Sequence, residues 1–188
     1  MLQPIYDAFG ITENADKAIP FGSGLINTTW KITNGGNAYI LQRINHNVFK
    51  KPELIAHNIN ITGQYLHNHY PDYLFVMPLK TIKDKEIYFD KDKGYFRLVP
   101  FIKNSHTIDV VTNAQIAFEA ATQFGRLTKL LSGFNASLLK ITLPDFHNLS
   151  FRFMQFKQAV ANGNLSRIKG SKKLIDAIFK NEHIGKNL

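Results

Sequence analysis

The fold is decided by residues 21–44, FGSGLINTTWKITNGGNAYILQRI, which read as a loop and then two strands joined by a tight turn. Residues 29–33 and 38–44 are rich in β-branched and aromatic side chains, which favour strands. The turn between them, Asn-Gly-Gly-Asn at 34–37, supplies the positive φ angles that a hairpin needs. Residues 18–22 precede the loop and predict a first strand. The stretch therefore predicts antiparallel pairing.

The loop between the first two strands carries a possible ligand signal. Gly22 and Gly24 bracket Ser23, and Asn27 and Thr28 follow. Glycine lets the main chain approach a ligand closely, so backbone N–H groups and short polar side chains of this loop can contact phosphate oxygens. Plain turn chemistry is the competing interpretation, because the full Gly-x-Gly-x-x-Gly of nucleotide-binding loops is absent.

Composition limits the classes of protein to consider. With 188 residues, 44% of them hydrophobic and 20% charged, the chain can build one sizeable core or two small ones. Its apolar runs are far shorter than the roughly 20 residues that cross a bilayer, and the N-terminus lacks the features of a signal peptide. The absence of cysteine excludes disulfides and thiolate metal sites and fits a reducing cytoplasm. We expect a cytoplasmic protein with no membrane partner.

The net charge of +9 raises the question of nucleic acid. The lysines are spread in ones and twos, mostly beside acidic residues or turns, which favours a solvated surface. A basic surface also suits a phosphorylated ligand. We expect no nucleic-acid partner, and a basic nucleic-acid-binding module remains the alternative.

The rest of the first hundred residues predicts an α+β fold. About five strands, mostly joined by hairpins, form an antiparallel sheet, with one long helix after the third strand. The expected elements are a short helix at 4–9 closed by Gly10, a helix at 53–69 with Pro52 in its first turn, strands at 73–78 and 79–82, and a hairpin of 87–90 with 95–101.

After residue 101 the pattern becomes helical. A capping box from Thr112 to Gln115 begins a helix whose apolar side chains share one face and which ends at Gly133. Further helices are expected at about 150–162 and 171–180. The chain is thus predicted to have two parts, residues 1–101 and 102–188, joined by a hinge at 98–105.

Four runs of sequence, in this order, resemble one superfamily. They are FGSGLIN at 21–27, YILQRIN at 39–45 with NVF at 47–49, FRLVPFI at 96–102, and LPDFHN at 143–148 with Arg152. Together they resemble the aminoglycoside phosphotransferase and choline kinase superfamily, which has a protein-kinase-like fold. Within it the sequence is most similar to the N-acetylhexosamine 1-kinase-like sugar kinases. The resemblance extends from about residue 18 to residue 170.

The resemblance implies an ATP-dependent phosphotransferase acting on a small hydroxylated substrate, with a sugar or amino sugar as the leading candidate. Its glycine loop would cover the ATP phosphates, and its hinge would bond adenine through main-chain groups. The residues implied for nucleotide binding are Gly22, Ser23, Gly24, Asn27 and Thr28 in the loop, with the Pro100 carbonyl and the Ile102 N–H at the hinge.

Two positions depart from the family pattern. The third strand normally carries a lysine that bonds the phosphates, and here Gln42 or Arg43 takes its place; only one of them can face the nucleotide, since side chains alternate along a strand. The helix glutamate that pairs with this lysine is also missing. Glu53 comes too early in the helix, and His57 or Asn58 lies nearer the expected place.

The third departure concerns the chemistry. The family needs an aspartate in a His-x-Asp-x-x-x-x-Asn loop and a second aspartate for magnesium, and no histidine here is followed two places later by aspartate. We therefore name no catalytic and no metal-binding residue. We expect an N-terminal fragment or a truncated gene product, inactive by itself, in which Mg²⁺ would bind only with the missing lobe. A non-enzymatic kinase-derived interaction module remains an alternative.

The substrate residues implied by the resemblance are Asp145, His147, Asn148 and Arg152, before and within a predicted helix. Asp145 and Asn148 could equally serve only to cap that helix. Exposed apolar surface in the incomplete second lobe is expected to favour self-association.

Overall fold

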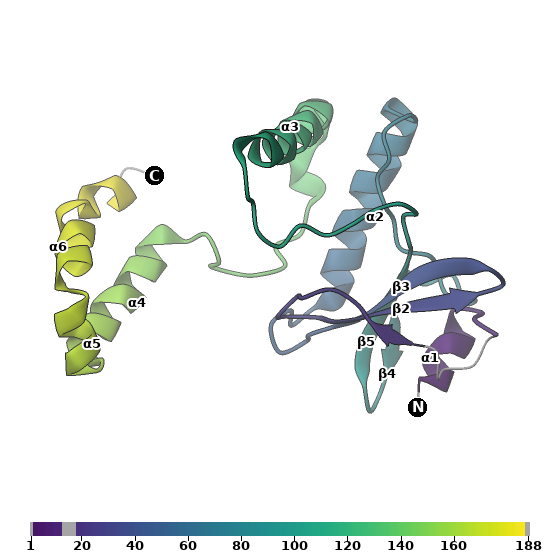
Figure 1. Cartoon of the computed structure of the whole chain (residues 1–188), viewed down its shortest axis with the longest axis horizontal. Helices are drawn as coiled ribbons and strands as arrows, with labels where there is room; N and C mark the ends of the chain where they lie inside the picture. Colours follow the sequence, from purple (N-terminus) through teal and green to yellow (C-terminus); the bar gives the residue numbers. More distant parts are fainter. Residues whose placement is uncertain (1, 13–17, 187–188) are drawn as a thin grey trace. The chain divides into compact units, whose positions relative to one another are not determined.

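The computed structural model describes residues 2–12 and 18–186 (Figure 1). Residues of the chain gather into two compact units, one up to Thr142 and one from Leu143 onward, and each is described by itself. The lobe boundary that the sequence predicts at residue 101 is a different division and stays a prediction.

The first unit is built on a five-stranded antiparallel sheet with the order β1-β2-β3-β5-β4. Its turn at 34–37 is the predicted hairpin, with φ of 55° at Gly35 and 78° at Gly36. The sheet and its helices confirm the predicted α+β class. The strands are β1 (Ile19–Pro20), β2 (Thr28–Asn34), β3 (Asn37–Ile44), β4 (Tyr88–Asp90) and β5 (Gly94–Pro100).

One face of the sheet is the hydrophobic core. Trp30, Leu41 and Leu98 are neighbours across β2, β3 and β5, so their side chains share this face. Helix α1 (Gln3–Ala8) buries Ile5 and Tyr6 against Leu41 and Leu98. The short predicted N-terminal helix therefore exists and covers the core face.

The opposite face meets the start of helix α2 (Pro52–His69). Phe96 lies in the core, so its neighbour Tyr95 points to the other face. Burial and the neighbouring Glu53 carboxylate raise the pKa of the Tyr95 phenol, which places the first turn of α2 against this face. Pro52 opens the helix, as predicted, because its missing N–H needs no partner there.

The prediction of strands at 73–78 and 79–82 is wrong. Within this segment only Leu79 pairs with the sheet, as an isolated bridge in which its N–H donates to the carbonyl of Leu98 at 2.7 Å. Pro78 has no N–H for a ladder, so the segment meets the edge of β5 once instead of running along it. The first strand is also shorter than predicted, since only Ile19 and Pro20 pair with β2.

Helix α3 (Ala114–Leu130) ends the first unit together with two 3₁₀ turns, η2 (Leu131–Gly133) and η3 (Ala136–Leu138). The side chain of Asn113 caps α3 by accepting from the N–H of Ile116, so the predicted cap at Thr112 is one residue too early. None of the residues of α3, all of which the structure describes, is buried, and Phe118 and Phe124 remain exposed.

The second unit contains helices α4 (Leu149–Asn162), α5 (Leu165–Gly170) and α6 (Lys172–Lys180), followed by the 3₁₀ turn η4 (Glu182–Lys186). The helices predicted at 150–162 and 171–180 are confirmed, and α5 was not predicted. Phe153, Phe156 and Phe179 pack together with ring centroids 5.5 to 6.0 Å apart. Among the residues of this unit up to Ile184, none is buried.

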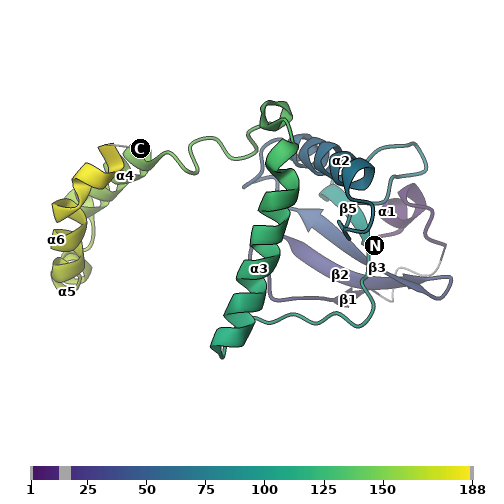
Figure 2. The ribbon, with the colours of Figure 1, turned by 90° about the horizontal axis from the view of Figure 1, so that it is seen from above.

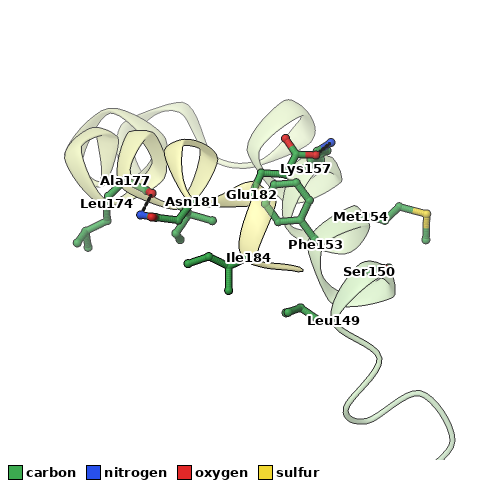
Figure 3. A pocket seen from close by; sticks show the side chains of 11 residues that line it. Leu149, Ser150, Phe153, Met154, Lys157, Leu174, Ala177, Asn181, Glu182 and Ile184 are labelled. Carbon is green, nitrogen blue, oxygen red and sulfur yellow. Dashed lines mark hydrogen bonds and ion pairs between the residues drawn. The ribbon is translucent and has the colours of Figure 1, made fainter. Parts of the chain in front are cut away.

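A pocket of about 790 Å³ lies between α4 and the segment formed by α6 and η4 (Figure 3). Its lining is mostly apolar and includes Leu149, Phe153 and Ile184. Lys157 and Glu182 form an ion pair of 2.9 Å that joins the two walls. In residues 2–12 and 18–186, no helix combines the length and apolar character that crossing a bilayer requires.

The central position of Leu41 in the core can be tested by truncation. Leu41 is 0% exposed, whereas Leu25 in the glycine loop is 101% exposed. We expect Leu41→Ala to lower the free energy of unfolding by about 3 kcal/mol, because it leaves a cavity between β3 and α1. Leu25→Ala, the matched control, should leave the urea midpoint unchanged. Equal effects of the two variants would contradict the described sheet register.

Candidate functional site

A row of polar side chains crosses the sheet on the face opposite α1. Thr29, Gln42 and Arg97 are neighbours on β2, β3 and β5. The side-chain amide of Gln42 donates to the hydroxyl of Thr29 at 3.1 Å. Its oxygen accepts from both Nε and Nη2 of Arg97, at 3.0 and 2.7 Å. Three strands are thus tied together by one continuous hydrogen-bonded row.

Arg97 brings a positive charge into this row without an acidic partner. Burial lowers the pKa of its guanidinium, and no neighbouring carboxylate opposes that effect. Among the described residues Arg97 takes part in no ion pair. The guanidinium still stays charged, because its pKa lies far above neutrality. Arg97 was not among the residues that the sequence predicted for the site.

The register separates Gln42 from Arg43. Gln42 shares its face with Arg97, whereas Arg43 points to the face of Leu41 and Phe96 and is exposed there. Arg43 donates through Nη2 to the hydroxyl of Thr28 at 3.3 Å. Gln42 and Arg43, the two candidates for the position of the family's lysine, therefore lie on opposite faces of the sheet.

The glycine loop lies between β1 and β2, and its residues from Phe21 to Ile26 are exposed. Gly22 has a φ of 79°, which favours glycine, while a side chain at Gly24 would point into open space. Ser23 donates to a carboxylate oxygen of Asp109 at 2.9 Å, which links the loop to the segment before α3. Asn27 anchors the end of the loop by accepting from the N–H of Asn45 at 2.9 Å.

The hinge presents main-chain groups at the outer edge of β5. The carbonyl of Leu98 points away from β3, because it accepts from Leu79. Carbonyls alternate along a strand, so that of Pro100 points the same way. Phe101 donates its N–H to the carbonyl of Ala38 on β3 at 3.0 Å, and the N–H of Ile102 has no hydrogen-bond partner among the described residues. The Pro100 carbonyl therefore lies at the edge of β5, and the Ile102 N–H follows it two residues along the chain.

Aromatic and basic side chains lie beside this hinge. The ammonium of Lys31 is 3.7 Å from the ring centroid of Phe101. Phe21, at the start of the glycine loop, meets Phe101 edge to face with centroids 5.8 Å apart. Lys31 alternates with Trp30, so it shares the face of Gln42 and Arg97. The glycine loop, β2 and the hinge thus meet at Phe101.

Helix α2 does not supply the expected partner for a phosphate-binding cation. His57 bonds the carbonyl of Leu138 at 3.2 Å, and Asn58 exchanges two hydrogen bonds of 2.8 Å with the backbone of Lys140. Both side chains hold the segment that follows α3 by hydrogen bonds to its backbone. His57 and Asn58, which lie nearer the place of the family's glutamate, thus carry no carboxylate and bond this segment. Glu53 meets Tyr95 instead.

The four residues predicted for substrate binding lie together in the second unit, at the start of α4. Asn148 caps α4 by accepting from Phe151 at 3.0 Å, and its amide donates to Asp145 at 2.9 Å. Arg152 donates to the carbonyl of Phe146 at 3.3 Å. The ring of His147 contacts that of Phe146, with centroids 4.8 Å apart. The cap alternative is thus correct for Asn148, and substrate contact stays a prediction.

These residues do not line the pocket of the second unit, whose walls begin at Leu149 and Ser150 (Figure 3). In the ranges 2–12 and 18–186, no group of three His, Asp or Glu side chains could hold a metal ion. In the first unit, the residues that the sequence predicts for nucleotide binding lie in the glycine loop, on β3 and at the end of β5.

Comparison with known proteins defines the fold. No protein-family model matches the chain. A solved structure of spectinomycin phosphotransferase, APH(9)-Ia, in complex with ADP and spectinomycin aligns with all of this chain at a TM-score of 0.61 and 14% identity. Amicoumacin kinase hAmiN, in complex with AMP-PNP, Ca²⁺ and Ami, aligns with 87% of it at a TM-score of 0.52 and 12% identity.

The chain has a kinase-like fold. It covers 57% of the length of the spectinomycin phosphotransferase chain and 53% of that of amicoumacin kinase. The kinase-like sheet accordingly carries the glycine loop between its first two strands, the long helix after the third, and the hinge after the last.

Sequence reasoning named residues of the glycine loop, Pro100 and Ile102 but missed Arg97 and Lys31, which share the face of Gln42. A signal was present, because each is a basic residue within a strand whose other side chains are mainly apolar or β-branched. Deciding which face each one takes required the pairing of β2, β3 and β5.

The backbone of the glycine loop makes a prediction for its two glycines. Gly22→Ala should lower the free energy of unfolding by about 1 kcal/mol, because alanine is strained at a φ of 79°. Gly24→Ala, in open space and without a positive φ, should be neutral or slightly stabilising. Chemical denaturation followed by circular dichroism measures both. A reversed order would contradict the described loop.

Proposed function

We propose that this chain carries the nucleotide-binding part of a kinase that transfers phosphate from ATP to a hydroxyl of a small molecule. The proposal rests on one observation, which is that a kinase-like sheet brings an open glycine loop, a half-buried cation and the edge of β5 to the same unit. The edge of β5 would bond adenine, the glycine loop would cover the phosphates, and the cation would balance the charge of the phosphates.

The residues present fit a nucleotide. Adenine would bond the Pro100 carbonyl and the Ile102 N–H, which has no hydrogen-bond partner in the part of the chain that the structure describes. The phosphates would lie under the glycine loop, where Ser23 and Gly24 are exposed and Gly24 leaves open space. Gln42 is the residue of β3 on this face, so we place it, and not Arg43, at the lysine position.

The substrate is proposed to be a small hydroxylated molecule, with a sugar or amino sugar as the leading candidate from the sequence resemblance. The two solved kinases of similar fold are named for small-molecule substrates, which supports this class. ATP supplies the phosphoryl group when bound, and catalytic and Mg²⁺-binding aspartates would come from residues outside this sequence. We therefore expect nucleotide binding, but no phosphate transfer, from these 188 residues alone.

Nucleotide binding is tested by thermal unfolding of the 188-residue chain with ATP, ADP and adenosine. A ligand at 100 times its dissociation constant stabilises the folded state by about 2.7 kcal/mol. We expect ATP at millimolar concentration to raise the melting temperature, since the loop, polar row and hinge are present. The absence of any shift with all three ligands would refute the proposal.

The net charge of +9 supports the alternative of a nucleic-acid-binding module, and the same protein tests it. Fluorescence anisotropy with labelled DNA and RNA oligonucleotides should give flat curves at physiological salt. Tight binding that weakens steeply with salt would instead favour the alternative.

The adenine contact is tested at the hinge by removing one N–H. Ile102→Pro removes this unpartnered donor, so we expect the affinity for adenosine to fall about tenfold, which corresponds to ~1.4 kcal/mol. Lys103→Pro, one residue further on, is the matched control and should retain binding. Isothermal titration calorimetry measures both, after circular dichroism has shown that each variant is folded. Unchanged adenosine binding by Ile102→Pro would place adenine elsewhere.

A further inference from the structure

One side chain of the polar row, that of Arg97, carries a charge that forms no ion pair among the described residues. Two basic side chains of the first unit, Lys31 and Arg97, share the face of Gln42. The ammonium of Lys31 makes a cation–π contact with the ring of Phe101. Arg97 is half-buried, and its only side-chain partner among the described residues is the neutral amide oxygen of Gln42.

A half-buried cation whose only side-chain partner is neutral has no charge to compensate its own. Removing a charge from water is costly unless an opposite charge compensates it, and an amide oxygen offers a hydrogen bond but no net charge. Glu53, the acidic residue at the start of α2, meets Tyr95 and not Arg97. No carboxylate of the described residues therefore neutralises this guanidinium.

The geometry of the guanidinium also leaves donors available. Arginine has five N–H donors, and Gln42 accepts from Nε and Nη2 only. The Nη1 group has no hydrogen-bond partner in the described ranges. Because one side of the fork is held by Gln42, the remaining donors are fixed in direction rather than free to rotate.

We propose that Arg97 supplies the positive charge that binds the phosphates of the nucleotide, in place of the lysine that β3 lacks, and that Gln42 positions it. This inference rests on the proposed function, since it concerns the same site. Arginine suits the role because its planar donors match phosphate oxygens. The charge would then come from β5, and β3 would contribute only the amide that orients it.

A purely structural role predicts something different. If Arg97 only ties β3 to β5, its replacement should lower stability and weaken ATP and adenosine binding to the same extent. If it binds phosphate, its replacement should weaken ATP binding and spare adenosine, which has no phosphate. The ratio of the two affinities therefore separates the roles, and it needs no catalytic activity.

Two variants test the proposal. Arg97→Gln removes the charge, and Gln42→Glu keeps Arg97 but gives it a carboxylate partner of nearly the same shape. Each should weaken ATP binding about tenfold or more and leave adenosine binding unchanged. Gln42→Glu should fold at least as well as the original chain, so it decides the question if Arg97→Gln is unstable. Calorimetry with ATP, adenosine and inorganic tripolyphosphate gives the affinities.

Arg43→Gln is the matched control. Like Arg97→Gln, it removes one positive charge. Arg43 follows Gln42 on β3, however, so its side chain lies on the opposite face of the sheet. It should leave the affinities for ATP and adenosine unchanged. A loss of ATP binding in Arg43→Gln equal to that in Arg97→Gln would mean that net charge alone matters, and would overturn the proposal.

The possible failures are distinguishable. If the original chain binds adenosine and ATP equally well, or if both test variants bind ATP as the original does, the role of Arg97 is refuted while nucleotide binding stands. If the original chain binds neither ligand, the proposed function itself fails. A tenfold selective loss of ATP and tripolyphosphate binding in Gln42→Glu supports the proposal.

Discussion

The structure depends on strand β3 being paired along its length with both β2 and β5. Two-sided pairing makes the alternation of side chains strict, because a slip by one residue would exchange the two faces. Leu41 consequently lies in the core against α1, and Gln42, the next residue, lies in the polar row. The core and the candidate site are thus set by the same backbone hydrogen bonds.

The polar row illustrates a conflict between stability and binding. An apolar side chain at position 97 would fill the half-buried space without the cost of desolvating a guanidinium. The sheet instead holds a cation there, supported by one glutamine that bonds both Arg97 and Thr29. Binding sites commonly retain such costly groups because a preorganised charge does not need to be ordered when the ligand arrives.

The two units differ in how their helices are held. In the first unit α1 and α2 bury residues against other elements, including Ile5, Tyr6 and Leu66. In the second unit no described residue up to Ile184 is buried, and side-chain caps such as Asn148 and Asn164 and a phenylalanine cluster hold the helices. Because helices of this length gain most of their stability from packing, we expect the second unit to be the less stable.

The sequence by itself determined the elements whose signals are local. The hairpin at 34–37 and Pro52 at the start of α2 both act through the conformational preferences of single residues, so they could be predicted. The ordered motifs also identified the kinase-like fold class. Only the tertiary structure decided which face each strand residue takes, and so separated Gln42 from Arg43 and revealed Arg97. It also bonded His57 and Asn58 to the backbone of Leu138 and Lys140, and reduced the pairing of the segment around Leu79 with the sheet to one bridge. These outcomes depend on pairing between residues far apart in the chain, which no local pattern encodes.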